Sequence, residues 1–136
     1  MTLQRSDNAE ATRELGFRVG RELKSGDVVA LQGPLGAGKT VFVQGLAGAL
    51  GITEAVSSPT FTIISEYRGS MTLYHMDLYR LNTPEEFTFL GVEEIIEGDG
   101  ITVVEWSEKA GDELPERSIR VNITIGDDGE RLIQVR

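Results

Sequence analysis

Hydrophobic and polar positions along the chain follow two periods, and the helical period predicts two helices, to which capping signals add a third. Apolar residues recur at near-helical spacing over residues 7–24 and again over residues 39–50. Ser6 or Asp7 is placed to cap the first of these helices. A third helix is predicted over residues 83–90, because this segment opens with a capping threonine, a proline and two glutamates.

Short apolar runs and alternating segments predict the strands that lie between these helices. Continuous apolar runs within residues 28–31 and 101–106 are typical of strands buried in the centre of a sheet. The segments predicted to pair as hairpins are residues 61–67 with 71–76, and residues 118–125 with 131–135 around an Asp-Gly turn. Elements in this order favour an α/β protein with a central mixed, largely parallel sheet and a C-terminal antiparallel hairpin.

Composition narrows the protein to a small acidic domain. The 136 residues carry 13 Lys+Arg and 22 Asp+Glu, a formal net charge of −9, and this length predicts one domain over residues 1–136. This negative net charge argues against strong direct binding of nucleic acid, which proteins normally achieve through basic patches. The lack of cysteine excludes disulfides, thiolate catalysis and cysteine-ligated zinc. A polar N-terminus and the lack of a long apolar run predict a cytoplasmic protein without membrane contact.

A glycine-rich segment between a predicted strand and a predicted helix carries the most specific chemical signal. Residues 33–40 read Gly-Pro-Leu-Gly-Ala-Gly-Lys-Thr and satisfy the pattern G-x-x-x-x-G-K-S/T of a phosphate-binding loop. In such a loop, backbone N–H groups turn toward phosphate oxygens, the lysine reaches the terminal phosphates and the hydroxyl binds magnesium. The predicted nucleotide-binding residues are Leu35, Gly36, Ala37, Gly38, Lys39 and Thr40. The motif makes the predicted fold a three-layer, P-loop NTPase-like one.

Hydrolysis of a bound nucleotide needs carboxylates beside the loop, and two residues at predicted strand ends are suited to this task. Asp77 directly follows one predicted strand, and Glu105 lies near the end of another. An open α/β sheet binds its ligands at such strand ends. We predict that Thr40, Asp77 and Glu105 hold magnesium, and that Lys39, Asp77 and Glu105 act in catalysis. Each carboxylate also has the simpler interpretation of a solvated charge.

Other residues near these positions leave alternative interpretations open. Thr60 follows Ser-Ser-Pro and is either a catalytic residue that senses the terminal phosphate or part of an ordinary turn. His75 is the single histidine, and such a residue on an apolar strand is more often packed in a core than a base or a ligand. Trp106 and Lys109 are placed to contact the nucleotide or a partner, although a tryptophan there is also typical of a core.

Several segments occur together in the order found in one protein family. They are Glu10-Ala11-Thr12 with Leu15-Gly16, Gly36-Ala37-Gly38-Lys39-Thr40, Ser58-Pro59-Thr60-Phe61, His75-Met76-Asp77-Leu78-Tyr79-Arg80-Leu81 and Val104-Glu105-Trp106. Through them nearly the whole chain resembles the TsaE, or YjeE, ATPases of bacterial tRNA threonylcarbamoyladenosine biosynthesis. The resemblance implies that Thr40 and Glu105 hold magnesium, that Asp77 has a catalytic or metal-linked role, and that Thr60 lies in a switch segment.

The resemblance also implies a function and a set of partners. Members of this family are auxiliary ATPases that bind and hydrolyse ATP with magnesium. They act on the TsaB and TsaD proteins, which transfer the threonylcarbamoyl group to an adenosine beside the tRNA anticodon, so tRNA would be held by that complex. The family's nucleotide also contacts the N-terminal segment and the C-terminal hairpin, which implicates the neighbourhoods of Arg5 and Gly129. Turnover is expected to be slow without partners, because the chain offers no obvious arginine finger.

Three other functions were considered, and each would require features that differ from those of an auxiliary ATPase. A small-molecule kinase usually needs a mobile lid rich in arginine. The sequence contains no arginine-rich lid segment, and Arg80 is the one arginine suited to such a role. A GTPase would carry an Asn-Lys-x-Asp segment, which the chain lacks. A nucleotide-gated binding module, in which hydrolysis is negligible and nucleotide controls the recruitment of a partner, stays an alternative to the ATPase.

Overall fold

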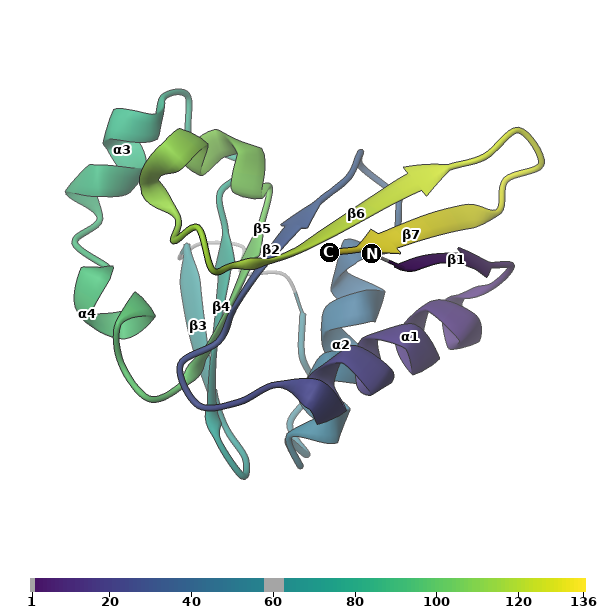
Figure 1. The fold of residues 1–136 in the computed structure, drawn as a ribbon, viewed down its shortest axis with the longest axis horizontal. Coiled ribbons are helices and arrows are strands. Elements are labelled where there is room, and N and C mark those ends of the chain that lie inside the picture. The colour runs from purple at the N-terminus through teal and green to yellow at the C-terminus, as the bar shows by residue number, and fades with distance from the viewer. Residues whose placement is uncertain (1, 58–62) are drawn as a thin grey trace.

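A seven-stranded sheet forms the centre of the fold, with helices on both of its faces (Figure 1). It is seen in a computed structural model that describes residues 2–57 and 63–136. The strands are β1 (Thr2–Ser6), β2 (Val28–Gln32), β3 (Ile64–Arg68), β4 (Thr72–Asp77), β5 (Ile101–Glu105), β6 (Ile119–Ile125) and β7 (Arg131–Val135). The helices are α1 (Ala9–Glu22), α2 (Lys39–Ala49), α3 (Pro84–Phe89), α4 (Glu93–Ile96) and the 3-10 helix η1 (Ser107–Glu113).

The sheet is parallel in its centre and antiparallel toward both edges. Its strand order is β1-β7-β6-β2-β5-β4-β3. β2 pairs in parallel with β5 and β6, and β4 pairs in parallel with β5, whereas the β1–β7, β6–β7 and β3–β4 pairs are antiparallel. This topology confirms the predicted α/β class, the mixed sheet and the C-terminal hairpin. It also brings the carboxyl ends of β2, β4 and β5 together, where an α/β sheet binds ligands.

Two apolar cores lie on opposite faces of the sheet, because successive side chains of a strand point to opposite sides. Val29 and Leu31 of β2 join the first core, which includes residues of α1 and α2. Val28 and Ala30 of the same strand join the second core, which includes residues of α3, α4 and η1. Phe42 of α2, a fully buried side chain, belongs to the first core. The predicted three-layer arrangement is therefore confirmed.

The N-terminal residues form a strand, β1, that the sequence did not predict. Thr2–Ser6 pairs antiparallel with β7, and Ser6 Oγ donates to the Asn8 carbonyl at 2.9 Å. The predicted cap at Ser6 or Asp7 is therefore wrong. The N-cap is Asn8, whose side-chain oxygen accepts a hydrogen bond from the Ala11 N–H at 2.8 Å. Local chemistry suits all three residues for a cap, and pairing with a strand from the other end of the chain decides between them.

The other predicted elements are present, with shifts at their ends. β5 ends at Glu105 rather than at Trp106, and α3 ends at Phe89. β3 begins at Ile64, and the first two residues of the strand predicted over residues 61–67 lie outside the described part of the chain. The sequence did not predict α4 and η1, because neither is long enough to show a hydrophobic period. No helix among the described residues has the length and apolar character needed to cross a membrane.

α1 and α2 approach each other so closely that glycine is required where they meet. A Cβ atom added at Gly45 of α2 would lie 1.9 Å from the Arg13 carbonyl oxygen of α1. One added at Gly16 of α1 would lie 2.0 Å from the Phe42 carbonyl oxygen of α2. Both distances are below any real contact, so a larger residue must push the two helices apart. This approach fixes the position of α2 and, with it, of the loop that precedes it.

Gly45→Ala is expected to destabilise the protein by about 1–3 kcal/mol, because the new methyl group overlaps main-chain atoms. The matched control is Gly48→Ala on the same helix, where an added Cβ would meet Phe17 Cδ2 at 3.8 Å, an ordinary contact. This second substitution should stabilise the protein by about 0.5–1 kcal/mol through helix propensity. Urea unfolding measures both changes, and equal effects of the two substitutions would show that α1 and α2 do not approach so closely.

Candidate functional site

The glycine-rich loop joins the carboxyl end of β2 to the first turn of α2. Gly36 and Gly38 have φ values of 78° and 98°, in the left-handed region that favours glycine. Gly38 is the N-cap of α2 and places no side-chain cap over its first turn. The first N–H groups of a helix lack partners within it and carry the positive end of its dipole. This local geometry is suited to binding phosphate.

An arginine from the C-terminal hairpin holds the loop in shape. Arg131 of β7 donates from Nε to the Ala37 carbonyl at 3.0 Å and from Nη2 to the Gly36 carbonyl at 2.9 Å. Across a planar trans peptide the C=O and the next N–H point in opposite directions. The contact at Ala37 therefore turns the Gly38 N–H away from the hairpin. The sequence did not predict this role, because a single arginine on a predicted strand belongs to no motif.

The loop lysine is held against the carbonyl groups of its own loop. Lys39 Nζ donates to the carbonyl oxygens of Gly33 at 2.5 Å and Pro34 at 2.9 Å. It also lies 4.1 Å from the centre of the Trp106 ring. Burial lowers the pKa of Lys39, and nearby carboxylates, first among them Glu105, oppose this change. A phosphate in place of these carbonyls would give the poorly hydrated ammonium group an acceptor of opposite charge.

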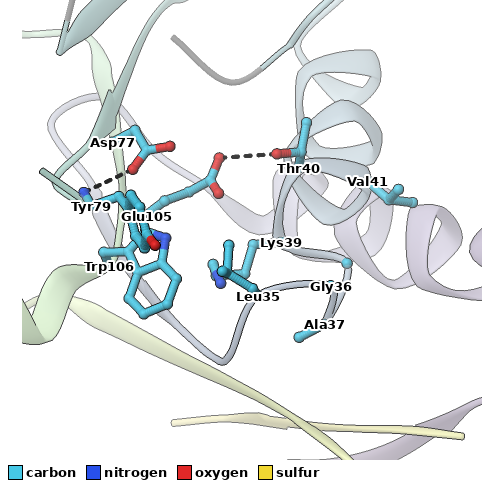
Figure 2. A pocket seen from close by; sticks show the side chains of 11 residues that line it. Leu35, Gly36, Ala37, Lys39, Thr40, Val41, Asp77, Tyr79, Glu105 and Trp106 are labelled. Carbon is cyan, nitrogen blue, oxygen red and sulfur yellow. Dashed lines mark hydrogen bonds between the residues drawn. The ribbon is translucent and has the colours of Figure 1, made fainter. Parts of the chain in front are cut away.

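The two predicted carboxylates end neighbouring strands and face the start of α2 (Figure 2). Asp77 of β4 and Glu105 of β5 are direct partners in the parallel register. Thr40 Oγ1 donates to Glu105 Oε2 at 3.4 Å, across the space between helix and sheet. The structure thus brings the four main predicted residues, Lys39, Thr40, Asp77 and Glu105, to one place.

These four residues line a pocket of about 460 Å³ together with the rest of the loop. Its walls are residues 35–41 with Asp77, Tyr79, Glu105 and Trp106. Leu35, Gly36, Ala37 and Gly38, all predicted to bind nucleotide, therefore also lie at this pocket. A second cavity of about 260 Å³ shares residues 36–38 and Val41 with the first. It extends from the loop to residues 6–9 and Thr12 and to Gly129 and Arg131 of the hairpin.

Three further predicted residues differ in their relation to these cavities. Gly129 lines the second cavity. Arg5 stands beside it, with its Nε 2.7 Å from Asp7 Oδ1 and its Nη1 3.7 Å from Glu130 Oε2. The hydrogen bond from Arg5 to Asp7 raises the pKa of this arginine. Thr60 lies outside the described residues, and its predicted role stays a prediction.

A buried histidine that the sequence did not place in the site contacts one of the carboxylates. His75 and Glu105 are 0% and 2% exposed, and His75 Nε2 lies 2.5 Å from Glu105 Oε2. The sequence favours a packed histidine at this position, and the residue is indeed buried. Its contact with Glu105 was not predicted. The signal that could have found it is the spacing of His75 and Asp77, which puts both on one face of β4.

Trp106 connects β5 to η1 in an uncommon backbone conformation. Its φ of 57° is the one positive value among the described residues other than glycine. The Trp106 and Tyr79 ring centres lie 5.0 Å apart, and Trp106 also packs against the second core. It therefore takes part both in the core and in the pocket. Lys109 instead donates to the carbonyls of Tyr79 and Leu81, which ties η1 to the segment after β4.

Asp77 is the more accessible of the two carboxylates, and its charge is costly in the ligand-free protein. Burial raises the pKa of Asp77, and the neighbouring charge of Glu105 also raises it, whereas a hydrogen bond from the Tyr79 N–H lowers it. That hydrogen bond reaches Asp77 Oδ1 at 2.9 Å. A bound cation would relieve this cost by pairing with the carboxylate.

Asp77→Asn is expected to stabilise the ligand-free protein and to weaken its response to magnesium. Asparagine keeps an oxygen for the Tyr79 N–H and removes the charge. Because the pKa of Asp77 in the folded protein lies above the ordinary value of 3.8, ionisation costs stability as pH rises through the folded-state pKa. The gain in stability of Asp77→Asn over the wild type should reach its full size above the folded-state pKa of Asp77 and vanish below pH 3.8. Thermal unfolding across this range measures it, and a variant less stable at neutral pH would contradict the argument.

The oxygen donors in the pocket fit magnesium, provided that phosphates supply other ligands. A hydroxyl from Thr40 and carboxylates from Asp77 and Glu105 line the pocket, and Mg²⁺ prefers hard oxygen ligands of these kinds. Over the described ranges, no group of three or more His, Cys, Asp or Glu side chains is placed to hold a metal ion. Magnesium at a nucleotide site is usually bound by one or two carboxylates together with phosphates and needs no such group.

We compared the sequence and the structure of this chain with those of known proteins. Residues 6–133 match the family described as "Threonylcarbamoyl adenosine biosynthesis protein TsaE". The chain belongs to the TsaE family. Membership confirms the resemblance found in the sequence and assigns the protein to tRNA threonylcarbamoyladenosine biosynthesis, a process of tRNA modification.

Individual members of the TsaE family match the chain over nearly its whole length. The tRNA threonylcarbamoyladenosine biosynthesis protein TsaE of Treponema pallidum (strain Nichols) is 48% identical over 130 residues, which cover 96% of each chain. That of Bacillus subtilis (strain 168) is 44% identical over 130 residues, which cover 95% of this chain and 81% of the relative. The crystal structure of Bacillus subtilis YdiB is similar with a TM-score of 0.86 at 38% identity, covering 98% of this chain and 83% of the other.

Proposed function

We propose that this protein is an auxiliary ATPase of tRNA threonylcarbamoyladenosine biosynthesis. It binds and hydrolyses ATP with magnesium, and it acts on the TsaB–TsaD complex rather than transferring the threonylcarbamoyl group itself. The observation that carries the proposal is the convergence of Lys39, Thr40, Asp77 and Glu105 on one pocket in a chain of the TsaE family. The acidic surface supports the division of labour, since tRNA would be held by the partners.

Each of these side chains has a separate chemical task in the proposal. Lys39 binds the terminal phosphates and opposes their charge. Thr40 and Glu105 hold magnesium, and Asp77 either joins them or orients the water that attacks the phosphorus. Magnesium held by these residues would supply positive charge that offsets the negative charge developing on the phosphates during the reaction.

The second cavity supports the expectation that the nucleotide also contacts the two ends of the chain. It opens from the same loop residues as the first pocket and reaches Asp7, Asn8, Gly129 and Arg131. We place the ribose and the base of the nucleotide there, on the side of the loop away from Asp77 and Glu105. Arg5 would act on this cavity through Asp7, with which it is paired.

The first pocket supplies little positive charge of its own. Lys39 is the one cationic side chain among the described residues that line it. Phosphoryl transfer is strongly accelerated when an arginine stabilises the charge of the transition state, and a partner can supply that arginine. Turnover is therefore expected to be slow for the isolated protein and faster with its partners.

Steady-state ATP hydrolysis by the purified protein tests the proposal, measured alone and with TsaB, TsaD and tRNA from the same source. The expected result is stimulation by the partners that is lost in Lys39→Ala. Nucleotide-dependent binding of the partners without any increase in hydrolysis would favour a nucleotide-gated binding module. A protein that binds ATP but not these partners would favour a kinase. Competition by GTP and GDP tests the preference for adenine in the same assay.

A further inference from the structure

We propose that His75 is a positioning residue that fixes the carboxylate of Glu105 for magnesium-dependent nucleotide binding. The inference rests on the proposed function, because it concerns the residue assigned there to the metal ion. It goes beyond that function by adding a buried side chain that does not line the nucleotide pocket. The argument depends on where the strands place His75, on its hydrogen bond and on the environment of its ring.

The sheet itself brings His75 to Glu105. Residues two apart on a strand share a face, so His75 and Asp77 lie on the same side of β4. Asp77 is the register partner of Glu105 on β5, so all three side chains lie on the face that carries α1 and α2. His75 thus stands one step deeper in the sheet than Asp77, beneath the carboxylate that faces Thr40.

The hydrogen bond between the two side chains has a defined direction. His75 Nε2 lies 2.5 Å from Glu105 Oε2. The carboxylate proposed to hold magnesium only accepts hydrogen bonds, so in this proposal His75 donates from Nε2 to Glu105. His75 Nδ1 is buried and has no hydrogen-bond partner among the described residues. A ring that donates from Nε2 satisfies the contact with Glu105 and leaves Nδ1 without a hydrogen bond among the described residues.

Packing alone does not account for a histidine at this position. The ring is fully buried on the side of the first core, and its Nδ1 is a buried polar atom without a partner among the described residues, which costs stability. An apolar side chain would fill the space without that cost. The feature that distinguishes histidine here is its N–H on Glu105, so its benefit must come through the carboxylate.

Among the residues that the structure describes, the other donors near Glu105 are distant or engaged elsewhere, so the orientation of its carboxylate depends on this hydrogen bond. Thr40 Oγ1 reaches the same Oε2 atom at 3.4 Å, a long contact. The ammonium of Lys39 donates to the loop carbonyls of Gly33 and Pro34. Side chains that hydrogen-bond a metal ligand orient it, and losing such a partner typically lowers metal affinity by about 10- to 100-fold. His75 would hold Glu105 in the orientation toward Thr40 that Figure 2 shows.

Two amide substitutions that differ by one methylene group separate positioning from packing. His75→Gln can place an N–H near the site of Nε2, whereas the side chain of His75→Asn is too short to reach Glu105. Binding of ADP is measured calorimetrically over a series of Mg²⁺ concentrations and again in EDTA. We expect His75→Asn to raise, by about 10- to 100-fold, the Mg²⁺ concentration at which half of the magnesium-dependent gain in ADP affinity is reached. For His75→Gln this concentration should lie within about threefold of the wild-type value. Binding of ADP in EDTA should be unchanged in both.

The matched control is Thr102→Val on the adjacent strand. Thr102 is also buried, and its Oγ1 also lacks a partner among the described residues, but it points to the other face of the sheet. This variant should keep the Mg²⁺ dependence of the wild type. Equal loss of ADP binding with magnesium and in EDTA in His75→Asn would overturn the inference in favour of a structural role. So would a His75→Asn variant with wild-type Mg²⁺ dependence.

A spectroscopic measurement on the ligand-free protein tests the hydrogen bond without any nucleotide. His75 is the single histidine of the chain, so both imidazole ¹⁵N signals belong to it, and their couplings to the ring C–H protons distinguish Nε2 from Nδ1. A protonated Nε2 that exchanges slowly with water is expected, and a ring protonated on Nδ1 alone would overturn the inference. Wild-type protein that binds no ADP with magnesium would instead refute the proposed function, and the inference with it.

Discussion

Glu105→Gln is expected to lower the rate of ATP hydrolysis by at least about 100-fold while nucleotide binding in EDTA is kept. Glutamine has nearly the shape of glutamate and can still accept from His75 Nε2, so the buried contact is preserved. It removes the negative charge proposed to act on magnesium and on the reaction. Metal-free ATP should bind no more weakly than to the wild type, because a carboxylate that repels its phosphates is gone.

Glu108→Gln is the matched control for this change of charge. Glu108 is exposed on η1 and does not line the pocket, although its charge also acts on Lys39. Hydrolysis rates of the two variants and their affinities for ADP, with magnesium and in EDTA, are compared. If Glu105→Gln lost binding in EDTA as severely as it lost hydrolysis, Glu105 would be a structural residue and the catalytic assignment would fail.

Local sequence patterns were sufficient for the central elements of the fold. β2 shows a continuous apolar run, α2 shows a helical period, and the glycine-rich loop between them carries a contiguous motif, so each was recognised from adjacent residues. β1 shows why the edges were harder to predict. β1 ends at Ser6, and Asp7 and Asn8 follow it, so three good capping residues stand in a row. Only the pairing of Thr2–Ser6 with β7 makes this segment a strand.

The candidate site divides in the same way between local and distant contacts. Lys39 and Thr40 belong to a contiguous motif, and Asp77 and Glu105 end strands whose order the fold class suggests. The roles of Arg131 and His75 were not visible in the sequence. Arg131 contacts Gly36 and Ala37 across 95 and 94 positions, and His75 contacts Glu105 across 30. Such contacts depend on strand order and register, which no single segment determines.

Lys39→Ala is expected to weaken the binding of ATP and ADP by about 10- to 100-fold, since a hydrogen bond to a charged group is worth about 1.5–3 kcal/mol. The ligand-free fold should tolerate the change, because the buried ammonium is poorly hydrated and its partners are loop carbonyls. Burial lowers the pKa of Lys39 below the ordinary 10.5. Wild-type affinity should therefore decline as pH rises through that lowered pKa, when the lysine loses its charge.

Lys24→Ala is the matched control, because Lys24 is exposed two residues after the end of α1 and lines neither cavity. The affinity of Lys24→Ala for ADP, and the fall of that affinity as pH rises, should match the wild type. Lys39→Ala should bind ADP weakly, and its affinity should not fall over the same alkaline range. Calorimetric titration of ADP at several pH values measures both features. A Lys39→Ala variant that kept the alkaline decline would assign that titration to another group and contradict a direct contact between the ammonium and the phosphates. A variant with wild-type affinity would remove the main reason for placing the nucleotide in this loop.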